Sequence, residues 1–191
     1  MGTIEVESAT EAVLKAEVIL YGGAASEDLA RQLADEIQKM WTEARGKILL
    51  DNRLYYLNFV INGRFESMLK PEEVLYNQNP RNNYIRVEKF VNGNISFMDG
   101  LGCNTGFFQL DNLYFGSTTA AHEFGHSLGL PHPINLDLRN AGQPGIMYPR
   151  GTLVDPEFQY DPTVKAGEKG GTIHPKNRKV WKEEVAMLTV N

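Results

Sequence analysis

The chain has 191 residues, of which 42% are hydrophobic and 23% charged, and its formal net charge is −5. This length fits one domain or two closely joined lobes, and the acidic balance gives no indication of a nucleic-acid partner. The N-terminal residues do not form a secretory signal, and no apolar stretch is long enough for a membrane span. We therefore expect a cytosolic protein, a mature protein that has lost its leader, or one domain of a longer chain.

The first part of the chain predicts a strand, a helix and a second strand. Residues 12–21 are rich in Val, Ile and Leu and predict the first strand. Ser26 is a suitable N-cap for a helix whose apolar residues recur at helical spacing until a stop at Gly46. Residues 54–61 predict the second strand, which we expect to close at the Asn-Gly pair of residues 62–63.

The middle of the chain predicts further strands and a second helix. Residues 84–98 predict a β-hairpin, with Asn92-Gly93 as its turn. Residues 105–110 predict another strand, which we expect to form the edge of the sheet. The Ser-Thr-Thr sequence of residues 117–119 is suited to cap a helix that runs to about Leu130.

The last third predicts little regular structure. Residues 131–175 are rich in Pro, Gly, Asn and Asp and show little periodicity. A final helix is predicted from near Pro175, with Trp181, Val185 and Leu188 on its buried face. We interpret the basic cluster in this region as the solvated face of that helix; it consists of Lys176, Arg178, Lys179 and Lys182.

Three of the four histidines in the chain lie within one short segment. His122 and His126 are four residues apart, so on a helix their imidazoles lie on one face and can converge on one metal ion. Gly129 is suited to end the helix and Pro131 cannot continue it, so the chain can turn back and offer His132 as a third ligand. Three protein ligands leave the fourth tetrahedral position for water, as in catalytic zinc sites.

Glu123 is turned by about 100° from its neighbour on the helix, so it can reach water at the metal without binding the metal. An isolated H-E-x-x-H sequence also arises by chance, and a lone histidine is usually a surface or core residue. Chance is a poor explanation here, because Gly129 and His132 also stand where the chemistry needs them. The fourth histidine, His174, is interpreted as a helix-start or surface residue beside Pro175.

Residues 122–132 resemble the extended zinc signature of the metzincin metallopeptidases, H-E-x-x-H-x-x-G-x-x-H. Residues 145–149, Gly-Ile-Met-Tyr-Pro, resemble the methionine turn that metzincins place beneath the zinc, with Met147 as its methionine. The resemblance implies a single α/β (α+β) catalytic domain over residues 1–191. It implies an upper lobe, about residues 10–130, with a twisted mixed sheet and two helices. The lower lobe, about residues 131–191, would be irregular, with the Met-turn and a C-terminal helix.

The details combine features of different metzincin groups. The Ile-Met-Tyr-Pro turn resembles that of matrixins, whereas Pro133, directly after the third histidine, resembles serralysins. Tyr148 is one residue too early to match the tyrosine that approaches the metal in astacins and serralysins, so no tyrosine ligand is expected. Cys103, the only cysteine, cannot form an internal disulfide and does not match the cysteine that keeps matrixins latent. We interpret it as a structural or incidental thiol.

The resemblance implies one catalytic zinc ion on His122, His126 and His132, with Glu123 as general base in peptide-bond hydrolysis. The substrate would be a protein or peptide bound in an extended conformation by a monomer, without nucleic-acid or membrane partners, and the family suggests secretion. Two alternatives stay open: a toxin or effector protease domain with one target protein, and a non-catalytic zinc-binding module, against which Glu123 argues. Calcium binding is also left open; its candidate ligands are Asp155, Glu157 and Asp161.

Selectivity would come from a pocket beside the zinc, between the active-site helix and the segment after the Met-turn. Pro149, Arg150 and Gly151 are expected to form part of its wall. Because apolar walls favour apolar side chains, we expect endopeptidase cleavage before Leu, Ile, Met or Phe in unfolded segments. An inward-pointing Arg150 would instead favour an acidic side chain, although an exposed arginine is the commoner outcome.

Overall fold

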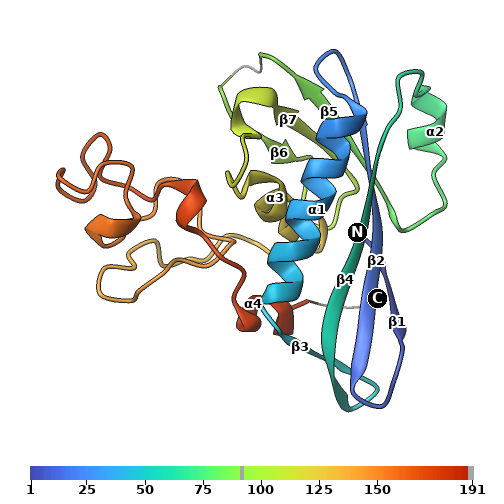
Figure 1. Cartoon of the computed structure of the whole chain (residues 1–191), viewed down its shortest axis with the longest axis horizontal. Helices are drawn as coiled ribbons and strands as arrows, with labels where there is room; N and C mark the ends of the chain where they lie inside the picture. Colours follow the sequence, from blue (N-terminus) through green and yellow to red (C-terminus); the bar gives the residue numbers. More distant parts are fainter. Residues whose placement is uncertain (91–92, 189–191) are drawn as a thin grey trace.

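A computed structural model describes residues 1–90 and 93–188 of the chain. Over these residues the chain forms a mixed α+β fold with one seven-stranded sheet and four α-helices, so the predicted fold class is confirmed. Figure 1 shows the sheet and the longest helix in one lobe, and a second lobe of mostly irregular chain beside it. In the described part of the chain, no helix is both long and apolar enough to cross a lipid bilayer.

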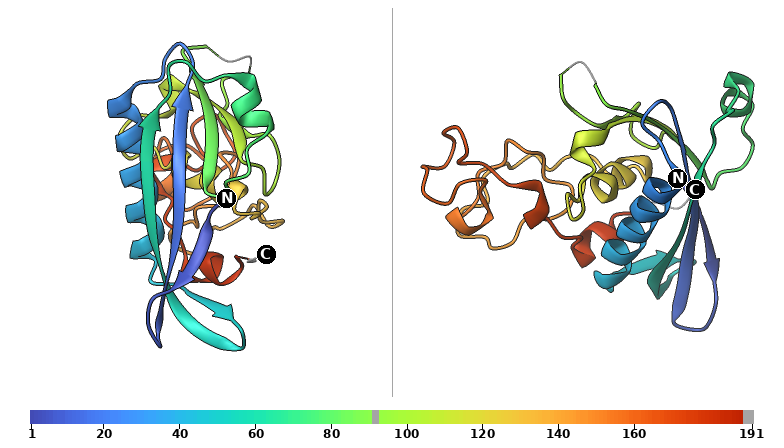
Figure 2. Two further views of the ribbon diagram at one scale, coloured as in Figure 1. Left: turned by 90° about the vertical axis from the view of Figure 1, so that its right-hand side faces the viewer. Right: turned by 45° about the horizontal axis from the view of Figure 1, so that its top comes forward.

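The sheet is mixed and has the strand order β3-β4-β2-β5-β7-β6, with β1 also paired to β2. Strand β2 runs parallel to β4 and β5, and β5 runs parallel to β7, whereas the other pairs are antiparallel. Figure 2 shows the two long strands β2 and β4 side by side. The strands are β1 Thr3–Val6, β2 Glu11–Tyr21, β3 Lys47–Leu50, β4 Arg53–Phe65, β5 Asn82–Glu88, β6 Phe97–Met98 and β7 Thr105–Gln109.

The predicted hairpin of residues 84–98 is wrong. Strand β5 pairs in parallel with β2 and β7 and not with β6, and Asn92 of the predicted turn lies outside the described residues. Tyr84 and Ile85 are both buried, a continuous burial that suits a strand in the middle of a parallel arrangement rather than a hairpin with one exposed face. Because β6 pairs antiparallel with β7, β6 forms the edge of the sheet, and the predicted edge segment 105–110 lies one strand further in.

Helix α1 begins where the sequence predicts it. Its N-cap Ser26 accepts a hydrogen bond from the backbone N–H of Leu29 at 3.2 Å. The buried side chain of Trp41 donates from Nε1 to the carbonyl oxygen of Ala121 at 3.1 Å, which ties α1 to the helix that carries the histidines. The α-helices are α1 Glu27–Glu43, α2 Pro71–Leu75, α3 Thr119–Ser127 and α4 Lys182–Ala186.

Strand β4 does not close at the predicted Asn-Gly pair but continues to Phe65. Gly63 serves a different purpose from a turn: a Cβ at this position would overlap the carbonyl oxygen of Ala30 in α1. The glycine therefore allows the helix to lie directly on the strand, a close approach that the local sequence signal does not distinguish from a turn.

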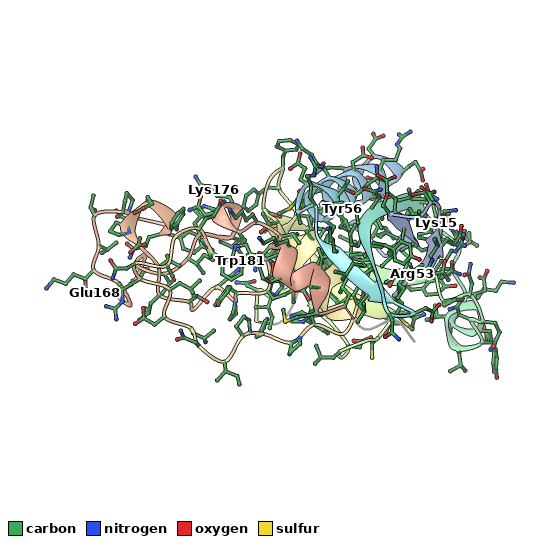
Figure 3. The ribbon with its side chains drawn as sticks, turned by 90° about the horizontal axis from the view of Figure 1, so that it is seen from below. Lys15, Arg53, Tyr56, Glu168, Lys176 and Trp181 are labelled. Carbon is green, nitrogen blue, oxygen red and sulfur yellow. The ribbon has the colours of Figure 1, made fainter. Side chains whose placement is uncertain are left out.

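The second lobe is largely irregular, as predicted, and it has a small core of its own around Val154 and Ile173. The last helix does not begin near Pro175, where the chain forms only a single 3₁₀ turn, but at Lys182. The predicted burial of Val185 and Leu188 is confirmed, and Trp181 is half-buried. Figure 3 shows Trp181 at the junction of the two lobes, with Lys176 and Glu168 in the irregular lobe.

Candidate metal centre

Helix α3 brings two of the predicted metal ligands together. The rings of His122 and His126 lie on the same face, with centroids 4.8 Å apart. The helix ends at Ser127, and Gly129 has a φ of 91°, the left-handed conformation predicted for this stop. The chain then turns back and places the ring centroid of His132 at 4.6 Å from that of His126.

The three histidine side chains converge through their Nε2 atoms. The Nε2 atom of His132 lies 3.1 Å from that of His122 and 3.0 Å from that of His126. Three imidazoles on one tetrahedral zinc ion, each at about 2.0–2.1 Å, have nitrogens about 3.3 Å apart, so this spacing fits a shared metal ion. Among the described residues, these three form the only cluster of three or more histidine, cysteine or carboxylate ligands.

Backbone carbonyls set the tautomer of two of these ligands. The Nδ1 atom of His122 lies 2.6 Å from the carbonyl oxygen of Ile146, and that of His126 lies 2.7 Å from the carbonyl oxygen of Leu130. Because a carbonyl only accepts, each Nδ1 carries the proton and each Nε2 keeps a lone pair for a metal. Burial also lowers the pKa of all three ligand histidines, which favours the neutral imidazole that binds metal.

Glu123 is held beside the histidines without joining them. Its side chain is buried, and Oε2 accepts a hydrogen bond from the backbone N–H of Met98 in β6 at 3.2 Å. Burial raises the pKa of this carboxyl to about 8, an effect that the positive charge of Arg178 partly opposes. The edge strand thus holds the carboxyl group of the residue that follows His122.

The predicted Met-turn lies against α3. Met147 is buried, and its neighbour Ile146 supplies the carbonyl oxygen that accepts from His122. The buried carboxylate of Glu184 in α4 accepts from the backbone N–H groups of Ile146 at 3.1 Å and Met147 at 2.9 Å. Sequence reasoning missed Glu184; its only signal is a position beside Val185, on the predicted buried side of the last helix.

The contact between the turn and α3 depends on Gly125. A Cβ at this position would overlap the sulfur of Met147, whose side chain is fully buried. We expect Gly125→Ala to lower the free energy of unfolding by about 1–3 kcal/mol, the usual cost of overpacking a core. Chemical denaturation of the metal-free protein measures this loss.

Gly151→Ala is the matched control, because an added Cβ there meets nothing within 4 Å. Its free energy of unfolding should stay within about 0.5 kcal/mol of that of the wild type. Equal stability of the Gly125→Ala variant and the wild type would contradict the packing between α3 and the Met-turn.

Arg178 lies directly behind His122, which corrects the interpretation of its basic cluster as a solvated helix face. The side chain is 6% exposed and donates from Nε to Thr118 Oγ1 at 3.0 Å and from Nη1 to the carbonyl oxygen of Tyr148 at 3.1 Å. Nη1 also lies 2.9 Å from Nδ1 of His122, but that nitrogen already carries a proton for Ile146 and cannot accept another. The sequence of the basic cluster does not indicate that one of its four side chains points into the protein.

An open cleft of about 560 Å³ runs past the histidines and Glu123. The edge strand contributes Phe97 and Met98 to one wall. The predicted wall residues are confirmed as part of the lining; these are Pro149, Arg150 and Gly151. Arg178 also lines the cleft, so two arginines border the space that the sequence predicts to be an apolar pocket.

The remaining sequence candidates lie apart from the three nitrogens. Tyr148 packs against Trp181, with ring centroids 5.6 Å apart, and does not line the cleft. His174 accepts at Nδ1 from the backbone N–H of Lys176, so it caps a 3₁₀ turn and not the start of the predicted helix. Cys103 is half-buried. In the described part of the chain, the calcium candidates do not form a cluster of potential ligands; these are Asp155, Glu157 and Asp161.

In comparisons with known proteins, no protein-family model matches the chain, and no curated protein matches it in sequence. The resemblance to metzincins therefore depends on the motif residues and on the geometry described above. What the structure establishes is a mixed α+β fold in which His122, His126 and His132 lie close enough together to bind a metal ion.

Proposed function

We propose that this chain is a zinc-dependent endopeptidase of the metzincin type, with His122, His126 and His132 as zinc ligands and Glu123 as the general base. The observation that carries the proposal is the convergence of three Nε2 atoms beside a buried carboxyl group on the same helix, at the wall of an open cleft. A purely structural zinc site needs no such carboxyl group and is usually closed by a fourth protein ligand.

The edge strand β6 is suited to bind the substrate. An extended peptide can pair with the free edge of a sheet through main-chain hydrogen bonds, and β6 lines the cleft next to Glu123. A zinc ion on the histidines would lower the pKa of an attacking water molecule and polarise the scissile carbonyl. Glu123 then accepts the proton from that water and passes it to the nitrogen of the leaving amine.

Hydrolysis of a general protein substrate tests this proposal. Zinc-loaded protein is expected to cleave casein into internal fragments, as an endopeptidase does. A chelator should stop the reaction, and added zinc should restore it, because the three imidazoles hold the reactive ion. Mass spectrometry of the products and a zinc titration measure both effects.

The outcome separates the alternatives that the sequence leaves open. Protein with bound zinc that cleaves neither casein nor any member of a peptide library would contradict a general endopeptidase. Cleavage of a single library sequence would favour an effector protease with one target, which uses the same residues for the same chemistry. Release of single residues from chain ends alone would exclude an endopeptidase.

A further inference from the structure

Two arginine side chains line the cleft, Arg150 after the Met-turn and Arg178 after the 3₁₀ turn that begins at Pro175. Arg150 is exposed, whereas Arg178 is 6% exposed. Among the described residues, neither arginine has a carboxylate within salt-bridge distance. A buried cation without a counter-ion is energetically unfavourable, so this arrangement calls for an explanation.

Neutral groups hold both guanidinium groups in place. Thr118 and the carbonyl oxygen of Tyr148 accept from Nε and Nη1 of Arg178, and Asn112 Oδ1 accepts from Nη2 of Arg150 at 2.7 Å. These bonds fix the orientation of the guanidinium planes but do not neutralise their charges. Within the described residues, Arg178 donates no hydrogen bond from Nη2, which leaves two N–H donors for a ligand in the cleft.

An arginine guanidinium keeps its positive charge at neutral pH. The cleft lining therefore carries two cationic side chains that, among the described residues, have no carboxylate in contact.

We propose that Arg150 and Arg178 bind a carboxylate of the substrate, on the residue that follows the scissile bond; this inference rests on the proposed endopeptidase function. A guanidinium plane offers paired donors that match the two oxygens of a carboxylate. An apolar side chain in the same place would leave the buried charge unpaired, and a site built for polar groups rejects such a ligand strongly. The preference for Leu, Ile, Met or Phe expected from the sequence is thereby replaced by a preference for Asp or Glu.

Two different groups of a peptide substrate can supply this carboxylate. It is either the side chain of an internal Asp or Glu, or the terminal carboxylate of a peptide that ends one residue after the scissile bond. Two pairs of fluorescent peptides distinguish the sources. The first pair carries Glu or Gln at an internal position, and the second pair ends at that position in Gln, as the free acid or as the amide.

Binding is measured by fluorescence anisotropy with zinc-loaded Glu123→Gln protein, so that no peptide is cleaved during the titration. The internal Glu peptide is expected to bind at least about tenfold more tightly than its Gln partner, as for a charge-assisted bidentate contact. Arg150→Gln should reduce this ratio to about threefold or less. Arg53→Gln is the matched control, since Arg53 is exposed on β4 in the other lobe, and it should leave the ratio unchanged (Figure 3).

Arg178→Lys tests the buried member of the pair, because lysine keeps the charge but not the planar pair of donors. In this variant too, the preference for the internal Glu peptide over its Gln partner should fall. Zinc content is measured in parallel to show that the zinc ligands remain in place. A tenfold preference for the free acid in the second pair, with none in the first, would identify the chain terminus as the source. Dissociation constants that differ by less than about twofold between the two peptides of each pair would overturn the inference.

Hydrolysis by the wild-type protein keeps this inference separate from the proposed function. Cleavage of the internal Glu and Gln peptides at equal rates, with equal binding, would leave the endopeptidase proposal intact and remove the carboxylate site. Tight, arginine-dependent binding of the Glu peptide without cleavage of any peptide would instead overturn the endopeptidase proposal and keep the carboxylate site.

Discussion

Replacement of Glu123 by glutamine is expected to lower peptide hydrolysis at least about 100-fold while zinc stays bound, because only the proton-transfer step is removed. Glutamine has nearly the same shape as glutamate and is neutral. The measurements are kcat/KM on a peptide substrate and zinc content after dialysis.

Glu183→Gln is the matched control for this experiment. It is the same chemical change on an exposed side chain of α4, outside the cleft, and it should keep near wild-type turnover. Near-normal turnover of the Glu123→Gln variant would show that Glu123 is not the base. The proposal would then have no proton acceptor among the residues identified in the site.

Replacement of His132 by alanine is expected to weaken zinc binding at least about 100-fold. Zinc sites in small domains contribute about 10–16 kcal/mol at neutral pH, so loss of one ligand from three removes several kcal/mol. His132 is also the ligand on the irregular segment rather than on α3, so its loss leaves the fold of the helix intact. Isothermal titration with zinc, together with metal content after dialysis, measures the change.

His174→Ala provides the matched control, because it is the same substitution at the one histidine outside the cluster. Zinc affinity in that variant should equal that of the wild type. Full zinc occupancy in the His132→Ala variant would show that His132 is not a zinc ligand. The site would then have only two histidine ligands, both on α3, and would lack the three-ligand geometry of a catalytic zinc site.

The sequence by itself determined the local parts of this protein. Four-residue spacing on a helix places His122 and His126 on one face because 3.6 residues complete a turn, and Gly129 permits the left-handed stop that returns His132. The same local logic predicted the start of α1 from Ser26. Each of these features depends on residues close together in the chain.

Only the tertiary structure decided the parts that depend on distant residues. The edge strand is β6 because β5 pairs with β2 and β7 across the sheet, a choice made by burial on both faces rather than by a turn signal. Arg178 and Glu184 are charged residues that a sequence argument leaves in solvent, because their burial is stabilised by hydrogen bonds to partners about 30 to 60 positions away. Packing of the last segment against α3 and the Met-turn therefore determined the charge of the cleft.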